Sequence, residues 1–235
     1  MNLMTLDSVE TLHKIFRCYR SYKGVGHLFR GQADSDWQLL PKAGRKEFDL
    51  PDNRDLHRFH DWESQAIAYG HRSTNVLEGL AIAQHHGLAT RLLDWSQNPL
   101  VASYFAVSSC KDVDGAVYIL EALDLYANHD LTIEQIKNNI GVYCYIPRAV
   151  SPRVLNQRGM FTVHCPANKE IDLVKSRYID SRYNLTKVII PRTLKNEILT
   201  VLDDYGIDDS TLFPDLDGLS RYKNWETNGM VNKKT

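Results

Sequence analysis

The chain has 235 residues, of which 43% are hydrophobic and 24% are charged, and its net charge at pH 7 is −1. This size suits one domain with a buried core, and the near-zero charge argues against general affinity for nucleic acid or anionic membranes. No apolar run reaches the roughly 20 residues of a membrane helix. Residues 1–7 lack the layout of a signal peptide, and the four cysteines form no CxxC pair. We therefore expect a cytoplasmic protein with no membrane partner.

The first third of the chain predicts two helices with a strand between them. Residues 7–21 have the spacing of an amphipathic helix, with Asp7 and Glu10 at the positions of a capping box. Residues 27–32 predict a strand, and residues 54–70 predict the second helix.

The second predicted helix carries a carboxylate, Glu63, on its apolar face. An unpaired buried carboxylate is costly, so Glu63 requires either a partner or a position at the edge of a cleft. A slightly rotated helix would instead leave Glu63 in water, and the sequence leaves both interpretations open.

Polar side chains are concentrated between residues 83 and 106. The preceding helix is expected to stop at Gly87, residues 90–93 predict a short buried strand, and Asn98-Pro99 begins a new helix. Arg91 lies inside the short apolar strand and therefore needs a partner or a cavity. Asp94 is its natural partner and Glu63 the alternative. Such an ion pair can also serve only to organise the fold.

The second half of the chain predicts more strands than helices. Strand patterns cover residues 115–120, 142–146, 157–164 and 186–190, and short helices are expected over 132–140 and from Thr193 to Gly206. The apolar residues 212–216 are expected to pack on the body of the protein. The alternation is too irregular for a doubly wound parallel sheet, so we predict an α+β fold, a single mixed-sheet domain with flanking helices.

The predicted domain covers residues 1–227. Its core spans 25–165, a strand and helix extension spans 166–227, and residues 228–235 form a polar tail.

Common catalytic motifs are absent from the sequence. His85 and His86 are adjacent, so on a helix they point about 100° apart and do not easily share an ion. The chain contains no HExxH, GxSxG, Walker A or GxGxxG motif, and we predict no metal. Arginine and aromatic side chains remain as the candidates for a functional site. Arg30 is followed by Gly31, where backbone can come close to a ligand, and arginine suits phosphate or carboxylate capture.

Three blocks of the sequence resemble the FRG domain, a family of mostly bacterial and phage-linked proteins named for a Phe/Tyr-Arg-Gly motif. The blocks are Phe29-Arg30-Gly31-Gln32, then Gln84 to Trp95 with Asn98-Pro99 and Tyr104-Phe105-Ala106, and more weakly Gln157 to Thr162. Their order and spacing agree with the family from about residue 25 to 165.

A looser resemblance links the chain to ADP-ribosyltransferases of the Arg-Ser-Glu type, which place an aromatic-Arg-Gly motif on their first strand. The resemblance implies that NAD is a substrate and that the protein is a toxin or a phage-defence effector. The implied NAD-binding residues are Arg30, Gly31, Gln32, His85, Thr90, Arg91, Trp95 and Tyr104. The family's catalytic glutamate corresponds here to Gln157, so Glu63 or Asp94 is expected to supply the carboxylate.

Two classes of function therefore remain open. The first is an enzyme that cleaves NAD or transfers its ADP-ribose to a nucleotide or protein target. The second is a ligand-sensing or protein-binding module without chemistry. A role in processing nucleic acid is disfavoured by the balanced charge. The sequence does not indicate an oligomeric state.

Overall fold

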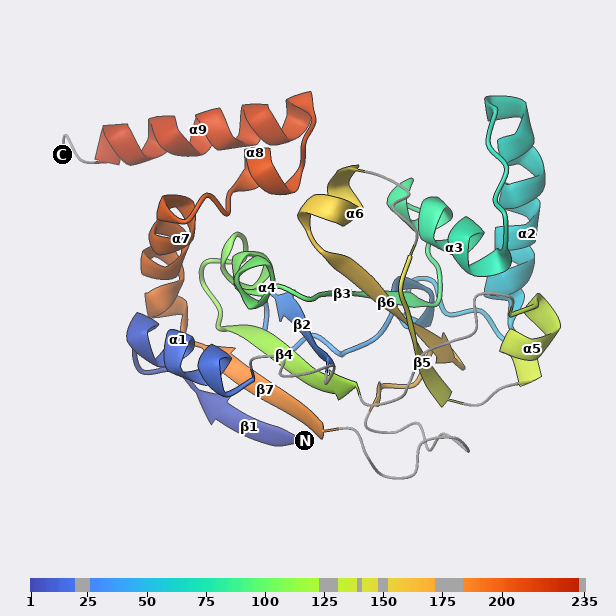
Figure 1. The fold of residues 1–235 in the computed structure, drawn as a ribbon, viewed down its shortest axis with the longest axis horizontal. Coiled ribbons are helices and arrows are strands. Elements are labelled where there is room, and N and C mark those ends of the chain that lie inside the picture. Colours follow the sequence, from blue (N-terminus) through green and yellow to red (C-terminus); the bar gives the residue numbers. More distant parts are fainter. Residues whose placement is uncertain (20–25, 123–130, 139–140, 148–151, 172–183, 233–235) are drawn as a thin grey trace.

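A single mixed β-sheet organises the protein in the computed structural model (Figure 1). The structure describes residues 1–19, 26–122, 131–138, 141–147, 152–171 and 184–232. The sheet has seven strands in the order β1-β7-β4-β2-β3-β6-β5. β1 and β7 pair in parallel, and each of the other described pairs is antiparallel. The predicted α+β fold with one mixed sheet and flanking helices is confirmed.

The strands are β1 (Asn2–Thr5), β2 (Gly26–Gln32), β3 (Leu92–Ser96), β4 (Gly115–Ala122), β5 (Gly141–Tyr145), β6 (Gly159–Cys165) and β7 (Asn184–Ile190). The helices are α1 (Val9–Cys18), α2 (Arg54–Ala66), α3 (Val76–His85), α4 (Pro99–Val107), α5 (Ile133–Asn138), α6 (Pro152–Asn156), α7 (Lys195–Asp204), α8 (Asp209–Leu212) and α9 (Leu216–Asn232). The described residues also include the 3-10 turns η1 (Lys42–Gly44), η2 (Ile67–Tyr69) and η4 (Arg192–Leu194). None of the helices in the described ranges is both long and apolar enough to cross a bilayer.

Local signals fixed several boundaries as predicted. Gly87 adopts a left-handed φ of 95° just after α3. The Asn98 side chain accepts a hydrogen bond from the backbone N–H of Leu100, and Pro99 is the first residue of α4. Of the apolar residues 212–216 expected to pack on the body, Leu212 is buried in the core and Phe213 packs against it, whereas Leu216 is 80% exposed.

Other boundaries differ from the prediction. Ser8, not Asp7, caps α1, because its hydroxyl accepts from the N–H of Thr11. β3 starts at Leu92 rather than at residue 90, and no side chain caps α7. The sequence did not predict β1, α6 or α9. The described part of α9 runs through Asn232, past the start of the expected polar tail. Residues 20–21, the end of the first predicted helix, lie outside the described residues.

The extension over residues 166–227 is part of the main sheet rather than an appendage. β7 lies between β1 and β4, and its residues pair with β4 from Asn184 to Ile190. α7 and α8 then place Ile198, Leu202 and Leu212 in the same cluster as residues of β2, β4 and α4.

The two faces of the sheet are covered differently. On one face, α1, α4 and α7 pack over β7, β4 and β2, while α2, α3 and α5 pack over β3, β6 and β5. Strand register places the two sets on the same face, because Phe29 of the first cluster lies opposite Ser96, which shares its side of β3 with Leu92 of the second. The other face is covered by segments outside the helices, through Leu39 and Ile171. A space therefore remains between α4 and α3 above the middle of the sheet.

Candidate pocket between α3, α4 and α6

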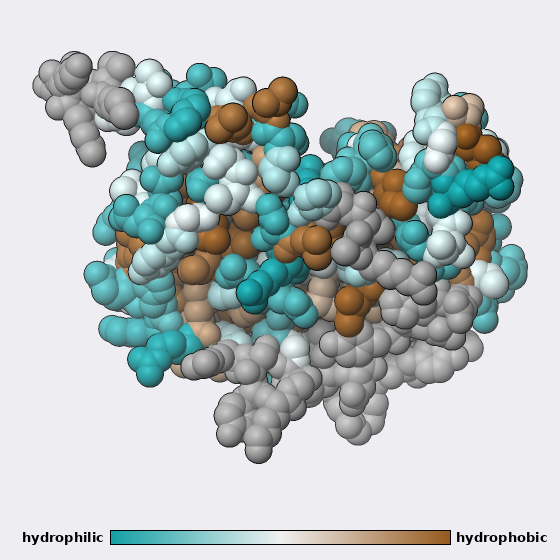
Figure 2. All heavy atoms as spheres, turned by 45° about the horizontal axis from the view of Figure 1, so that its top comes forward, coloured by the Kyte–Doolittle hydropathy of each residue, from teal (hydrophilic) through white to brown (hydrophobic). Residues whose placement is uncertain are grey.

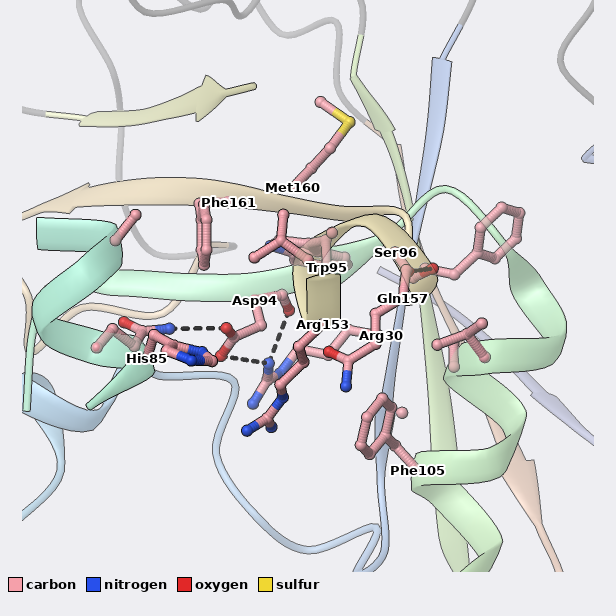
Figure 3. Close-up of a pocket in the computed structure, with 18 residues that line it drawn as sticks. Arg30, His85, Asp94, Trp95, Ser96, Phe105, Arg153, Gln157, Met160 and Phe161 are labelled. Carbon is pink, nitrogen blue, oxygen red and sulfur yellow. Dashed lines mark hydrogen bonds and ion pairs between the residues drawn. The ribbon is translucent and has the colours of Figure 1, made fainter. Parts of the chain in front are cut away.

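A pocket of about 290 Å³ fills this space. β2, β3 and β6 form its floor, and α3, α4 and α6 form its walls (Figure 3). Figure 2 shows a notch in this face, between the α8–α9 side and the α2–α3 side of the molecule. The aromatic lining comes from Phe29, Phe105 and Phe161, and the polar lining from Arg30, Gln84, His85, Asp94, Ser96, Arg153 and Gln157.

Arg30 lies where β2 and β3 separate. These strands share one described register pair, Phe29 with Ser96, whereas β2 pairs with β4 along its whole length. The Arg30 Nη1 donates to the backbone oxygen of Asp94 at 2.7 Å and lies 3.7 Å from its carboxylate. The guanidinium thus closes the opening between the strands. The Arg30 side chain is 14% exposed, and its buried Nε–H has no hydrogen-bond partner.

Asp94 is the carboxylate that lines the pocket, and its side chain is 62% exposed. Gln84 Nε2 donates to Asp94 Oδ1 at 2.7 Å. The Thr90 hydroxyl donates to Gln84 Oε1 at 2.5 Å, which fixes the orientation of the amide. The Thr90 oxygen in turn accepts from the N–H of Leu92. Asp94 is therefore accessible to a ligand and held in place from two sides.

Arg153 enters the pocket from α6 with its hydrogen-bond donors free of described partners. The structure gives its guanidinium a cation-π contact with Phe213, 4.6 Å from the ring centre, and no hydrogen bond or ion pair to a described residue. Burial lowers the pKa of Arg153, while the charges of Asp94 and Asp215 raise it. The guanidinium keeps its charge at neutral pH, so Arg153 is available to an anion.

His85 lies at the rim of the pocket. Burial lowers the pKa of His85, and His86 and Arg153 lower it further, against the opposing charge of Asp215. His85 is therefore neutral at neutral pH. No three His, Cys, Asp or Glu side chains in the described parts of the chain are placed to hold a metal ion.

The match to a known family covers the part of the chain that forms β2, α3, β3 and α4. Residues 26–115 match the model of the FRG domain. The chain is similar to the FRG domain over this stretch. The matched stretch runs from β2 to the first residue of β4 and contains Arg30, Gln84 and Asp94, whereas Arg153 and Gln157 lie outside it. No curated protein and no solved structure gives a significant match. The resemblance to ADP-ribosyltransferases stays a prediction.

Six of the predicted site residues line the pocket, namely Arg30, Gly31, His85, Asp94, Trp95 and Gln157. Two of these, Arg30 and Asp94, lie within 3.7 Å of each other. Five others, Gln32, Glu63, Thr90, Arg91 and Tyr104, are not among the lining residues. Their surroundings explain why.

The predicted pairing of Arg91 with Asp94 or Glu63 is wrong. Arg91 precedes β3, and its Nε and Nη2 donate to the two carboxylate oxygens of Asp55 at 2.8 and 2.6 Å. Nη2 also donates to Asn53. Burial by itself lowers the pKa of Arg91, but the hydrogen bonds and charge of Asp55 raise it above its ordinary value. This pair joins the start of α2 to β3 within the stretch that matches the FRG model, and it is structural.

Of the alternatives left open for Glu63, the structure shows a partner, and Glu63 does not line the pocket. It accepts a hydrogen bond from the Ser73 hydroxyl where α2 crosses α3. A side chain at Gly79 would come within 2.9 Å of Glu63 Oε1, so the two helices are close there. Glu63 thus has the partner that its half-buried position requires.

The rings of Tyr104 and Trp95, two of the implied NAD-binding residues, make their contacts elsewhere. Tyr104 lines a separate small hollow beside α9, and burial raises its pKa, as do its hydrogen bond with Asp209 and the charge of that residue. The Trp95 indole packs in the core cluster on the other face of the sheet, and its Nε1 donates to Thr162 Oγ1 at 2.9 Å. Neither ring is placed to stack on a ligand in the pocket.

Gly31 and Gln32 serve the packing of β2 against its neighbours. A Cβ on Gly31 would lie 1.8 Å from the Ala102 oxygen, so Gly31 lets α4 approach the sheet rather than admitting a ligand. Gln32 is buried and donates from Nε2 to the Gln38 oxygen.

Gln157 borders the pocket but takes part in structural contacts. Its Nε2 donates to the Leu212 oxygen at 3.1 Å, and its backbone oxygen accepts from the Ser96 hydroxyl at 2.6 Å. It joins α6 to both β3 and the C-terminal segment.

Sequence reasoning missed Arg153 and the aromatic lining. Arg153 belongs to a helix of five residues, too short to give a periodic signal. Phe29 and Phe161 looked like ordinary strand residues, and Phe105 like a core residue of α4. Gln84 belonged to the recognised block, but nothing in the sequence showed that it contacts Asp94.

Proposed function

We propose that the pocket binds a nucleotide, with NAD as the ligand, and that Asp94 acts on it. The observation that supports this is the meeting of two guanidinium groups, Arg30 and Arg153, beside one accessible carboxylate. Guanidinium groups bind phosphate oxygens in bidentate geometry. The aromatic walls offer flat apolar surface to a base or a nicotinamide ring.

The proposed reaction is cleavage of the bond between nicotinamide and ribose. The bonding electron pair leaves with nicotinamide, and a ribosyl oxocarbenium ion remains. A fixed carboxylate stabilises such a cation most where its charge develops. Asp94, held by Gln84 and Arg30, has this role in the proposal. Water, or a nucleophilic group of a target molecule, then forms the new bond to ribose and releases a proton. Action as a toxin or phage-defence effector belongs to this proposal.

Binding without chemistry is the second candidate. The observation that favours it is Gln157, which stands where the resemblance calls for a glutamate and whose amide is engaged with Leu212. In that case Arg30 and Arg153 recognise an anionic ligand, and Asp94 only positions Arg30.

Calorimetric titration with NAD, combined with chromatography of the products, distinguishes the two candidates. Asp94→Asn keeps the shape of the side chain, so an enzyme should retain NAD affinity and lose at least tenfold in turnover. Arg153→Gln should weaken NAD binding about tenfold or more, since it removes a charged phosphate contact. Arg158→Gln is the matched control, because Arg158 is exposed and does not line the pocket.

Absence of NAD binding in the wild type would refute the proposal. Binding without any nicotinamide release would leave the second candidate. If expression is toxic to cells, toxicity should disappear in Arg153→Gln and persist in Arg158→Gln.

A further inference from the structure

A smaller hollow of about 130 Å³ opens beside the pocket and shares Arg30, Gln84 and Asp94 with it. We call this hollow the side pocket. Its remaining lining residues are Lys42, Arg45, Gly87, Leu88, Leu92 and Leu93. Because Arg30 borders both hollows, a ligand in the main pocket can extend past its guanidinium into the side pocket.

The wall that carries Lys42 and Arg45 is held firmly in place. The N–H of Ala43 donates to the backbone oxygen of Thr90 at 3.0 Å, the residue whose hydroxyl orients Gln84. Lys42 Nζ donates to the Gly87 oxygen at 3.0 Å. A Cβ on Gly44 would lie 2.0 Å from the Ala167 oxygen, so η1 packs closely against that segment. The backbone of η1 is thus fixed against the end of α3 and the start of β3.

The side pocket has an excess of positive charge. Arg30, Lys42 and Arg45 surround one carboxylate, Asp94, which already accepts from Gln84 and lies next to Arg30. The exposed Arg45 side chain has no hydrogen bond or ion pair to a described residue, and the Arg30 Nε–H is buried without a partner. Lys42 uses one of its three donors on Gly87. Arg45 and Lys42 therefore have donors available for an anion in this hollow, whereas the Arg30 Nε–H lies below the surface.

We infer that the side pocket takes a second phosphate group, so that the ligand is a nucleoside diphosphate or a derivative of one. This inference rests on the proposed nucleotide binding. Adjacent phosphates of a diphosphate share a bridging oxygen and need cationic groups side by side. Arg153 and Arg30 meet the first phosphate in the main pocket, and Arg30, Lys42 and Arg45 meet the second. A nucleoside monophosphate leaves the side pocket empty.

Calorimetric titrations with AMP, ADP and ADP-ribose test the inference. In the wild type, ADP and ADP-ribose should bind at least tenfold more tightly than AMP, because each charge-assisted hydrogen bond contributes about a factor of ten or more. Arg45→Gln should reduce that preference by about tenfold and leave AMP affinity unchanged. Lys42→Gln should act in the same direction. Lys46→Gln is the matched control, because Lys46 is exposed and outside the side pocket.

The failures of the inference and of the proposed function differ. Equal affinity for AMP and ADP overturns the inference while leaving nucleotide binding in place. So does an Arg45→Gln variant that weakens AMP and ADP to the same extent. If none of the three nucleotides binds, the proposed function fails together with the inference.

Discussion

Replacing Asp55 by alanine should destabilise the protein severely, because it leaves Arg91 as an unpaired charge in the core. The Arg91 side chain is 1% exposed and that of Asp55 is 6% exposed. Two short hydrogen bonds join them, and the remaining contacts of Arg91, to Asn53 and Cys165, are with neutral groups. Removing one partner of a buried ion pair costs about 3–5 kcal/mol. That is a large part of the roughly 5–15 kcal/mol by which a domain is stable.

Urea denaturation of three variants checks this reasoning. Asp94→Ala is the control, because its side chain is 62% exposed and such a pair contributes about 1 kcal/mol or less. The double variant Asp55→Ala/Arg91→Met removes both charges and should recover part of the stability lost in Asp55→Ala. If Asp94→Ala costs as much as Asp55→Ala, or if the double variant recovers nothing, the assignment of Asp55 as the partner of Arg91 is refuted.

Three further predictions concern other parts of the structure. Burial lowers the pKa of His164 to about 4, and the charges of Arg30 and Arg91 also lower it. The histidine is therefore neutral in the folded protein. The contribution of His164 to the free energy of unfolding should therefore be fully present above pH 6.5 and fall by on the order of 3 kcal/mol as the pH drops toward 4. Denaturation at several pH values checks this, and His164→Gln should flatten the pH profile of stability. Gly31→Ala should lower stability by about 2 kcal/mol or more, because the added methyl group meets the backbone of α4; thermal melts against Gly229→Ala, where nothing lies within 4 Å, should show no such loss in the control. Gln157→Glu removes the hydrogen-bond donor to the Leu212 oxygen and should lower the free energy of unfolding by about 1–2 kcal/mol. It also adds a carboxylate to the pocket wall and should raise NAD hydrolysis. Unchanged hydrolysis would place residue 157 away from the ribose.

Short-range signals explain what the sequence predicted well. Gly87 and Asn98-Pro99 act through their own backbone geometry, so their effects do not depend on distant contacts. The apolar pattern of β2 is likewise local, and its burial follows from pairing with β4. The meeting of Arg30 and Asp94 was predictable because both are polar groups on otherwise apolar segments.

Long-range contacts explain the errors. Asp94 was the natural partner for Arg91 by sequence distance, whereas Asp55 lies 36 positions away at a helix start whose location depends on tertiary packing. β1 is short and exposed, and it becomes a strand through its pairing with β7 near the other end of the chain. No sequence pattern indicated Arg153, because its place in the pocket wall depends on how α6 packs against residues 26–115.

A crystal structure of the protein soaked with ADP-ribose tests the central claim most directly, since it reports the position of the ligand rather than binding alone. The account predicts electron density for the ligand between α3, α4 and α6, with phosphate oxygens within hydrogen-bond distance of Arg30 and Arg153 and the ribose beside Asp94. Ligand density elsewhere on the protein, with this pocket empty, would contradict it.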